Sequence, residues 1–259
     1  YFITTFSSAT QPTTYTLNEA KNGKEIQVIE NNEALANKIK SYNLPTKEFF
    51  VLKTEKGNEL NAWILKPKDF DPSKKYPVFM YQYSGPGSQQ VNNDWNSTDD
   101  YWFMMLTQQG YIVACVDGRG TGFKGADFKK VTQKELGKFE VEDQIDAAKV
   151  IGNYPFVDKN RIGIFGWSFG GFMASNCILK GNDIFKMAIA VAPVTNWRFY
   201  DSIYTERYMQ TPAENASGYD ENSPINHVDK LKGKFLLIHG SGDDNVHVQN
   251  SMQMMEALI

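Results

Sequence analysis

The sequence predicts an α/β fold in which helices wrap a mixed, mainly parallel β-sheet. From residue 76 onward, apolar runs mostly end in Gly, Asp or Ser, and near-continuous apolar strands are typical of parallel sheets buried on both faces. Amphipathic stretches separate these runs, which gives the alternation of strands and helices that such a sheet requires. Upstream, residues 48–54 and 59–67 flank a Lys-Gly-Asn turn at residues 56–58, which predicts an antiparallel hairpin at the N-terminal edge of the sheet. The apolar runs are YPVFMYQYS, GYIVACVDGRG, RIGIFGW, FKMAIAVAP and KFLLIHGSGDD.

The first part of the chain precedes this sheet. Residues 1–30 are rich in Thr, Ser, Tyr and Asn and show no helical period, which predicts two short strands and a loop. In residues 30–45, Leu35 and Ile39 lie four positions apart, as on one face of a helix, and Pro45 stops the pattern. We therefore expect a short helix between the first strands and the hairpin.

Two amphipathic helices are predicted within the alternating region. Residues 139–151 place Val141, Ile145 and further apolar side chains near one face, with carboxylates in the first turn, where the helix dipole favours them. Residues 169–181 begin on glycines and end at Gly181, a residue type that is common just after a helix. In sheets of this kind the chemistry lies at the carboxyl ends of the strands, so site residues are expected in the loops that follow them.

Composition narrows the function classes. With 27 Lys and Arg against 30 Asp and Glu, the formal net charge is −3, which argues against a nucleic-acid or anionic-membrane binder. Hydrophobic residues make up 41% and charged residues 22% of the 259 positions, as in ordinary globular proteins, and no apolar run approaches the roughly 18 residues of a spanning helix. Cys115 and Cys177 lie in apolar surroundings, so we expect buried thiols and no disulfide framework. Neither a metal nor a cofactor is expected.

Both ends of the sequence suggest a piece of a longer protein. The chain begins at Tyr1 in a β-rich phrase, without an initiator Met, and closes inside an amphipathic helix that has no stop signal. Targeting signals therefore cannot be read from it.

Residues 166–171, Gly-Trp-Ser-Phe-Gly-Gly, contain the sharpest local motif. The G-x-S-x-G pattern follows the strand RIGIF and precedes a helix, which is the strand–turn–helix context of a nucleophilic serine. The glycines permit the tight turn, and Ser168 is left exposed at a helix N-terminus, where N–H groups and the helix dipole favour a developing oxyanion. This context disfavours the alternative that the segment is only a glycine-rich packing turn.

A candidate acid follows the last apolar run. A carboxylate in the loop after a late strand is the place from which a Ser–Asp–His triad draws its acid in this chain order. Of the two adjacent carboxylates we assign Asp243, which comes first after the strand, and we expect Asp244 to cap the following helix.

None of the three histidines fits the role of the general base. His227 lies well before Asp243, and His239 lies at a strand end, where a structural role is expected. His247 follows Asp243 by four residues, too close to contact both the acid and the serine on another loop. We therefore expect the catalytic histidine beyond Ile259, which would leave the chain catalytically incomplete by itself.

Five phrases together resemble the catalytic domain of the prolyl oligopeptidase family of serine peptidases: GWSFGG, DGRGTGFKGADF, FEVEDQIDAAK, AVAPVTNWRFYDSIYTERYM and LLIHGSGDDNVHVQNS. The resemblance implies an α/β-hydrolase domain over residues 31–259, with the triad histidine missing, and the last strands of an upstream β-propeller over residues 1–30. It implies removal of N-terminal dipeptides from peptides with a penultimate Pro or Ala, and a periplasmic or extracellular location. Homodimerisation is left open.

The resemblance also assigns roles to individual residues. It matches Ser168 to the nucleophile and Asp243 to the triad acid, and it matches the Tyr83 hydroxyl and the Phe169 backbone N–H to the oxyanion hole. It matches Asn245 to a residue that binds the substrate carbonyl before the scissile proline, with Arg207 near it. The remaining matches form an apolar pocket for the proline ring, a flat box that suits a small cyclic side chain: Phe169, Val194, Trp197, Tyr200, Tyr204 and Val246.

Two departures from the family pattern accompany the missing histidine. The family's nucleophile is commonly followed by Tyr, whereas this chain has Phe169. The carboxylates that recognise the free N-terminus of the substrate lie in the propeller and are not in this chain. Dipeptide release is therefore weighed against tripeptidyl peptidase, acylaminoacyl peptidase or esterase activity on the same fold, and against a non-catalytic homologue that acts as a binding scaffold.

Overall fold

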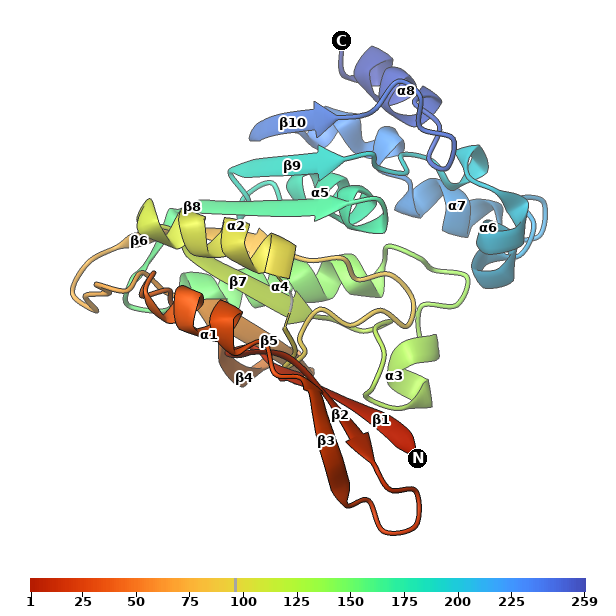
Figure 1. Cartoon of the computed structure of the whole chain (residues 1–259). Coiled ribbons are helices and arrows are strands. Elements are labelled where there is room, and N and C mark those ends of the chain that lie inside the picture. Colours follow the sequence, from red (N-terminus) through yellow and green to blue (C-terminus); the bar gives the residue numbers. More distant parts are fainter. Residues whose placement is uncertain (96) are drawn as a thin grey trace.

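The computed structural model describes residues 1–95 and 97–259, with the backbone alone for residues 97–99. The described residues form two β-sheets, one of three strands and one of seven. The smaller sheet is antiparallel and consists of β1 (Phe2–Ser8), β2 (Gln11–Asn18) and β3 (Glu25–Glu30). It projects from the end of the molecule where the hairpin of the larger sheet lies (Figure 1).

The larger sheet has the strand order β10-β9-β8-β6-β7-β5-β4. The hairpin strands pair antiparallel with each other, and β5 pairs antiparallel with β7, whereas all other neighbours are parallel. This is the mixed, mainly parallel sheet that the sequence predicts, with its antiparallel part at one edge. The strands are β4 (Glu48–Lys53), β5 (Glu59–Leu65), β6 (Tyr76–Tyr81), β7 (Ile112–Asp117), β8 (Val157–Trp167), β9 (Met187–Val191) and β10 (Lys234–Ile238).

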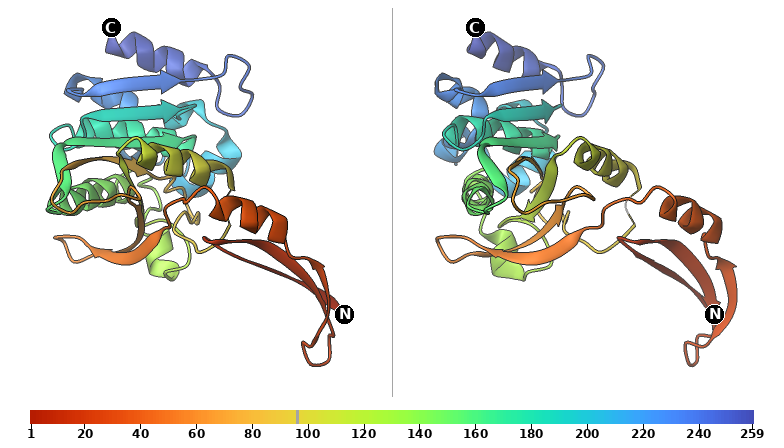
Figure 2. Two further views of the ribbon diagram at one scale, coloured as in Figure 1. Left: turned by 60° about the vertical axis from the view of Figure 1, so that its left-hand side comes forward. Right: turned by 90° about the vertical axis from the view of Figure 1, so that its left-hand side faces the viewer.

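Helices cover both faces of the larger sheet. Figure 2 shows α2 (Ser97–Gln108) on one face and α4 (Phe139–Gly152) with α5 (Phe169–Lys180) on the other. Strand β7 shows the consequence, because all six of its residues are buried and successive side chains enter two different hydrophobic clusters. The other helices are α1 (Glu33–Lys40), α3 (Ala126–Lys130), η1 (Trp197–Phe199), α6 (Ser202–Met209), α7 (Ala216–Asn222), η2 (Pro224–Lys230) and α8 (Gln249–Leu258).

The predicted hairpin and short helix are both present. The turn between β4 and β5 is closed by Thr54 N–H donating to the carbonyl of Asn58 at 2.9 Å, and Gly57 has φ +86°, which favours glycine. Helix α1 ends at Lys40, before Pro45.

The first 30 residues differ from the prediction, because they form three strands rather than two. A second turn, in which Glu19 N–H donates to Lys24 C=O at 2.9 Å and Gly23 adopts φ +73°, folds β3 back on β2. No helix within the described residues is long and apolar enough to cross a membrane.

Candidate active site

Ser168 alone makes the turn between β8 and α5. Its backbone lies at φ 58° and ψ −118°, a conformation that is strained for any residue with a side chain. The Ser168 N–H donates to the carbonyl of Val191 at 2.9 Å, and this bond fixes the turn against the end of β9. The chain thus presents the serine at the carboxyl end of a central strand and at the N-terminus of a buried helix, as the motif predicts.

Three glycines around Ser168 have no room for a side chain. A Cβ on Gly166 would lie 2.2 Å from the carbonyl oxygen of Gly170, and a Cβ on Gly170 would lie 2.7 Å from the carbonyl oxygen of Gln82. A Cβ on Gly171 would lie 2.7 Å from the carbonyl oxygen of Val191. Close backbone approach therefore explains these glycines, although their own φ values are not positive.

The predicted oxyanion donors lie on two different segments, the loop after β6 and the first turn of α5. The N–H of Phe169 belongs to the first turn of α5, where amide groups have no partner within the helix. Tyr83 follows β6, and its ring packs against the Phe169 ring with 6.1 Å between the centroids. A Cβ at Gly85 would lie 2.5 Å from Cε1 of Tyr83, so a glycine there leaves room for the tyrosine ring.

A small cavity of about 30 Å³ opens beside the serine. In its wall, the Trp197 and Tyr204 rings stack at 6.1 Å between centroids, and Tyr200 meets Tyr204 edge-on at 5.4 Å. The pKa of the Tyr204 hydroxyl is raised, mainly by burial, so this hydroxyl remains a neutral donor. The cavity is lined by Tyr83, Ser168, Phe169, Val194, Trp197, Tyr200 and Tyr204.

Asp243 lies in the loop that follows β10. Its Oδ1 accepts hydrogen bonds from the backbone N–H groups of Asn245 and Val246, each at 3.0 Å. Its Oδ2 lies 3.5 Å from Nε2 of His239, and the Asp243 side chain is about a quarter exposed. One carboxylate oxygen thus stabilises the loop, while the other can contact a further group.

His239, directly after β10, holds the Asp243 loop in place through both of its ring nitrogens. Its side chain is nearly buried, Nε2 lies 2.7 Å from the carbonyl oxygen of Val246, and Nδ1 lies 2.6 Å from Oγ of Ser251. The carbonyl can only accept, so Nε2 donates to it and Nδ1 accepts from the serine hydroxyl. Both ring nitrogens are occupied, which leaves His239 no free nitrogen for a catalytic serine.

The other two histidines also make no contact with Ser168. His227 Nε2 lies 2.7 Å from the carbonyl oxygen of Glu221. The pKa of His227 is lowered, mainly by burial. His247 is exposed at the start of the segment leading into α8. Among residues 1–95 and 97–259, no histidine lies within hydrogen-bonding distance of the Ser168 hydroxyl.

The structure brings some of the other predicted substrate-binding residues to the cavity and not others. The Tyr200 hydroxyl donates to Oδ1 of Asn245 at 2.9 Å, which joins the aromatic cavity to the Asp243 loop. Val246 is buried in the main core cluster and does not line the cavity. Arg207 is exposed on α6 and does not line the cavity either.

Gln82 is a neighbour of the site that the sequence pattern does not reveal. It precedes Tyr83, is 1% exposed, and its Nε2 donates to the carbonyl oxygen of Gly170 at 2.8 Å. In the described part of the chain, no group of three or more His, Cys, Asp and Glu side chains is arranged to bind a metal ion.

Comparisons with known proteins give one consistent result. The family model described as the prolyl oligopeptidase family matches residues 96–259, more than half of the chain. Dipeptidyl aminopeptidase B from Saccharomyces cerevisiae is 45% identical over 246 residues, which are 91% of this chain and 30% of that protein. Dipeptidyl peptidase 4 from Trichophyton equinum is 40% identical over 263 aligned residues, covering 100% of this chain and 34% of that protein.

A solved structure gives the same match in three dimensions. The crystal structure of Porphyromonas gingivalis dipeptidyl peptidase 4 superposes with a TM-score of 0.96 at 52% identity, covering 99% of this chain and 36% of that one. The chain therefore spans about a quarter to a third of the length of the curated relatives that it matches.

Proposed function

The chain belongs to the prolyl oligopeptidase family, with the α/β-hydrolase fold of its catalytic domain, and from this premise we propose that it is the main part of the catalytic domain of a serine dipeptidyl peptidase. The observation that carries the proposal is the strained turn at Ser168, which opens on a cavity shared with Tyr83 and apolar side chains. Residues 31–259 belong to this domain, and residues 1–30 are the end of an upstream β-propeller.

The proposed chemistry is acyl transfer through Ser168. Its Oγ attacks the carbonyl carbon of the scissile bond, and the oxyanion that forms accepts hydrogen bonds from the Tyr83 hydroxyl and the Phe169 N–H. A histidine takes the serine proton and passes it to the leaving amine, and Asp243 orients that histidine through the carboxylate oxygen that its own loop does not occupy. Because no histidine of the described residues contacts Ser168, we assign the base to a residue outside this sequence.

The cavity supports selectivity for a small residue at the cleavage point. Its tyrosine, tryptophan and phenylalanine rings form rigid walls around a small space, which admits the ring of proline or the methyl group of alanine better than a long side chain. Asn245, oriented by Tyr200, supplies an amide N–H to the substrate carbonyl that precedes this residue. Release of two residues rather than three then depends on groups outside the sequence.

The test uses the full-length protein with Xaa-Pro-anilide and Xaa-Xaa-Pro-anilide substrates. We expect turnover of the first at least 100-fold faster than of the second, labelling of Ser168 by a fluorophosphonate, and loss of both in Ser168→Ala. Preference for the longer substrate would assign a tripeptidyl activity instead. No turnover and no Ser168 adduct would overturn the enzymatic proposal in favour of a binding scaffold.

A further inference from the structure

Gln82 connects the two segments that carry the oxyanion donors, the loop after β6 and the first turn of α5. It follows β6 directly, its backbone N–H donates to the carbonyl of Phe165 at 3.3 Å, and the next residue is Tyr83. Its side-chain Nε2 donates to the carbonyl oxygen of Gly170 in the first turn of α5, 2.8 Å away and buried. The glutamine side chain therefore bonds the loop of the tyrosine donor to the helix turn of the amide donor.

A directed series of buried hydrogen bonds fixes the orientation of this amide. Gln144 Nε2 donates to the carbonyl of Val116 at 2.7 Å and approaches Oγ of Ser84 at 3.4 Å. The Ser84 hydroxyl in turn donates to Oε1 of Gln82 at 3.1 Å. Since carbonyl oxygens only accept, the oxygen of the Gln82 amide faces Ser84 and its nitrogen faces Gly170.

The surroundings of the Gln82 amide are buried and closely packed. Gln82 and Ser84 are each 1% exposed. A Cβ on Gly166 would approach Gln82 Nε2 to 2.6 Å, so the amide fills the space beneath the turn at Ser168. Ser84 adopts φ 65°, an uncommon conformation for serine that places its hydroxyl in this network.

We propose that Gln82 is a positioning residue for the oxyanion hole, an inference that rests on the proposed function. Its amide fixes the separation between the Tyr83 hydroxyl and the Phe169 N–H, two donors that must point at the same developing charge. Gln82 itself touches neither the substrate nor the reacting atoms. Its effect belongs to the transition state, because the charge that these donors stabilise is absent from the bound substrate.

The size of the effect follows from the donors that it aligns. Loss of one oxyanion donor typically slows the chemical step about 100- to 1,000-fold. A misplaced donor retains part of its effect, so we expect Gln82→Met in the full-length protein to lower kcat about 10- to 100-fold. The KM for Xaa-Pro-anilide and the inhibition constant of the product dipeptide should stay within about threefold, since the pocket rings do not depend on this bond.

Two further variants separate positioning from a general loss of structure. Gln90→Met is the matched control, because Gln90 lies in the same loop but its side chain accepts from the Tyr81 hydroxyl at 2.8 Å and does not contact the Ser168 turn. Ser84→Ala removes only the hydroxyl that orients the Gln82 amide, and we expect a milder fall in kcat of about two- to fivefold. Should Gln82→Met fold poorly, Ser84→Ala alone still tests the proposal.

The decisive measurement is a double-mutant cycle with Tyr83→Phe. If Gln82 acts by positioning the tyrosine hydroxyl, Gln82→Met should reduce kcat and the rate of fluorophosphonate labelling far less in the Tyr83→Phe background. An equal reduction in both backgrounds, or wild-type kcat in both Gln82→Met and Ser84→Ala, would overturn the inference and leave the proposed function standing. A wild-type protein that neither turns over substrate nor is labelled would overturn both.

Discussion

The Tyr200 hydroxyl donates a hydrogen bond to the side-chain oxygen of Asn245 at 2.9 Å, across 45 positions of sequence. Tyr200 lines the aromatic cavity, while Asn245 lies two residues after Asp243 in the loop that follows β10. Burial is the largest cause that raises the pKa of Tyr200, and the nearby charges of Asp201 and Asp243 raise it further, which keeps the phenol in its donor form. With Oδ1 occupied, the Asn245 amide presents its nitrogen as the donor for a substrate carbonyl.

Substitution Tyr200→Phe removes this bond and keeps the ring. We expect the KM for Xaa-Pro-anilide to rise about five- to tenfold with kcat within about twofold, because a hydrogen bond that orients a ground-state contact contributes about 1 kcal/mol. Tyr208→Phe is the control, since Tyr208 packs on Tyr204 at 4.9 Å between centroids but does not line the cavity. An unchanged KM in Tyr200→Phe would show that Asn245 needs no such orientation.

The backbone strain at Ser168 predicts a separation of stability from activity. Relief of a strained positive-φ position contributes about 1–3 kcal/mol, against about 0.5–1 kcal/mol for the extra chain entropy of glycine. Ser168→Gly should therefore be about 1 kcal/mol more stable than Ser168→Ala, measured as a higher Tm of the intact protein. Both variants should lose at least about three orders of magnitude in kcat. Equal Tm values would mean that the turn at φ 58° stores no strain.

Close packing beneath the turn predicts that Gly166 tolerates no side chain. A Cβ there would lie 2.2 Å from the Gly170 carbonyl oxygen, and both the helix start and the strand end would have to move. We expect Gly166→Ala to destabilise the protein by about 3 kcal/mol and to abolish labelling of Ser168. Gly240→Ala is the control for stability, because no described atom lies within 4 Å of a Cβ at that position. Similar Tm values for the two variants would contradict the crowding.

Sequence patterns were informative where the cause is local. The strand–turn–helix placement of Ser168 follows from a motif six residues long, and the buried strands follow from apolar runs. Strand β3 cannot be predicted in the same way, because it is defined by its pairing with β2 rather than by a strong hydrophobic period of its own. The alternation of elements gives the class of sheet, but it does not state that β8 lies beside β6 rather than β7.

Contacts between distant segments account for what the pattern missed. Gln82 and Gly170 are 88 positions apart, and no spacing rule joins a glutamine after one strand to a carbonyl in a later helix. Spacing alone also does not tell which neighbours of a pocket residue reach the cavity: Val246 packs into the core and Arg207 faces solvent. Their roles toward substrate remain predictions.

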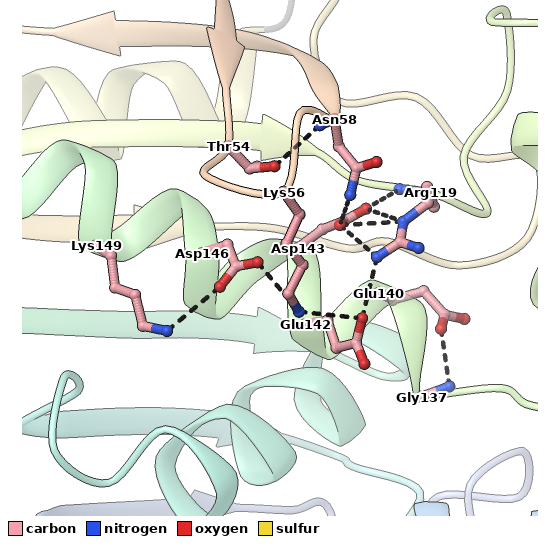
Figure 3. A network of polar contacts seen from close by, with 10 residues as sticks. All are labelled: Thr54, Lys56, Asn58, Arg119, Gly137, Glu140, Glu142, Asp143, Asp146 and Lys149. Carbon is pink, nitrogen blue, oxygen red and sulfur yellow. Dashed lines mark hydrogen bonds and ion pairs between the residues drawn. The ribbon is translucent and has the colours of Figure 1, made fainter.

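Helix α4 carries carboxylates in two contrasting settings (Figure 3). The Asp143 carboxylate is fully buried but accepts hydrogen bonds from Asn58 and from both the backbone and the guanidinium of Arg119. Glu140 is equally buried, and its Oε2 accepts one bond from Gly137 N–H at 3.0 Å. Its Oε1 has no hydrogen-bond partner among the described residues. The ion pair with Arg119 and these hydrogen bonds thus satisfy Asp143, whereas Glu140 has little to stabilise a charge.

Burial, the largest cause, raises the pKa of Glu140 to about 8, and the nearby charge of Asp143 acts in the same direction. Between its ordinary value of 4.5 and about 8, the folded protein keeps a proton that the unfolded chain releases, so this group makes stability fall as pH rises through that window. The loss is at most about 1.4 kcal/mol per pH unit.

We expect Glu140→Gln, which keeps an oxygen for Gly137, to flatten this slope, with a Tm above wild type at pH 8.5 and no gain at pH 5. Glu142→Gln, whose carboxylate is 41% exposed, should leave the slope unchanged. A wild-type slope retained in Glu140→Gln would show that Glu140 is not the group that titrates.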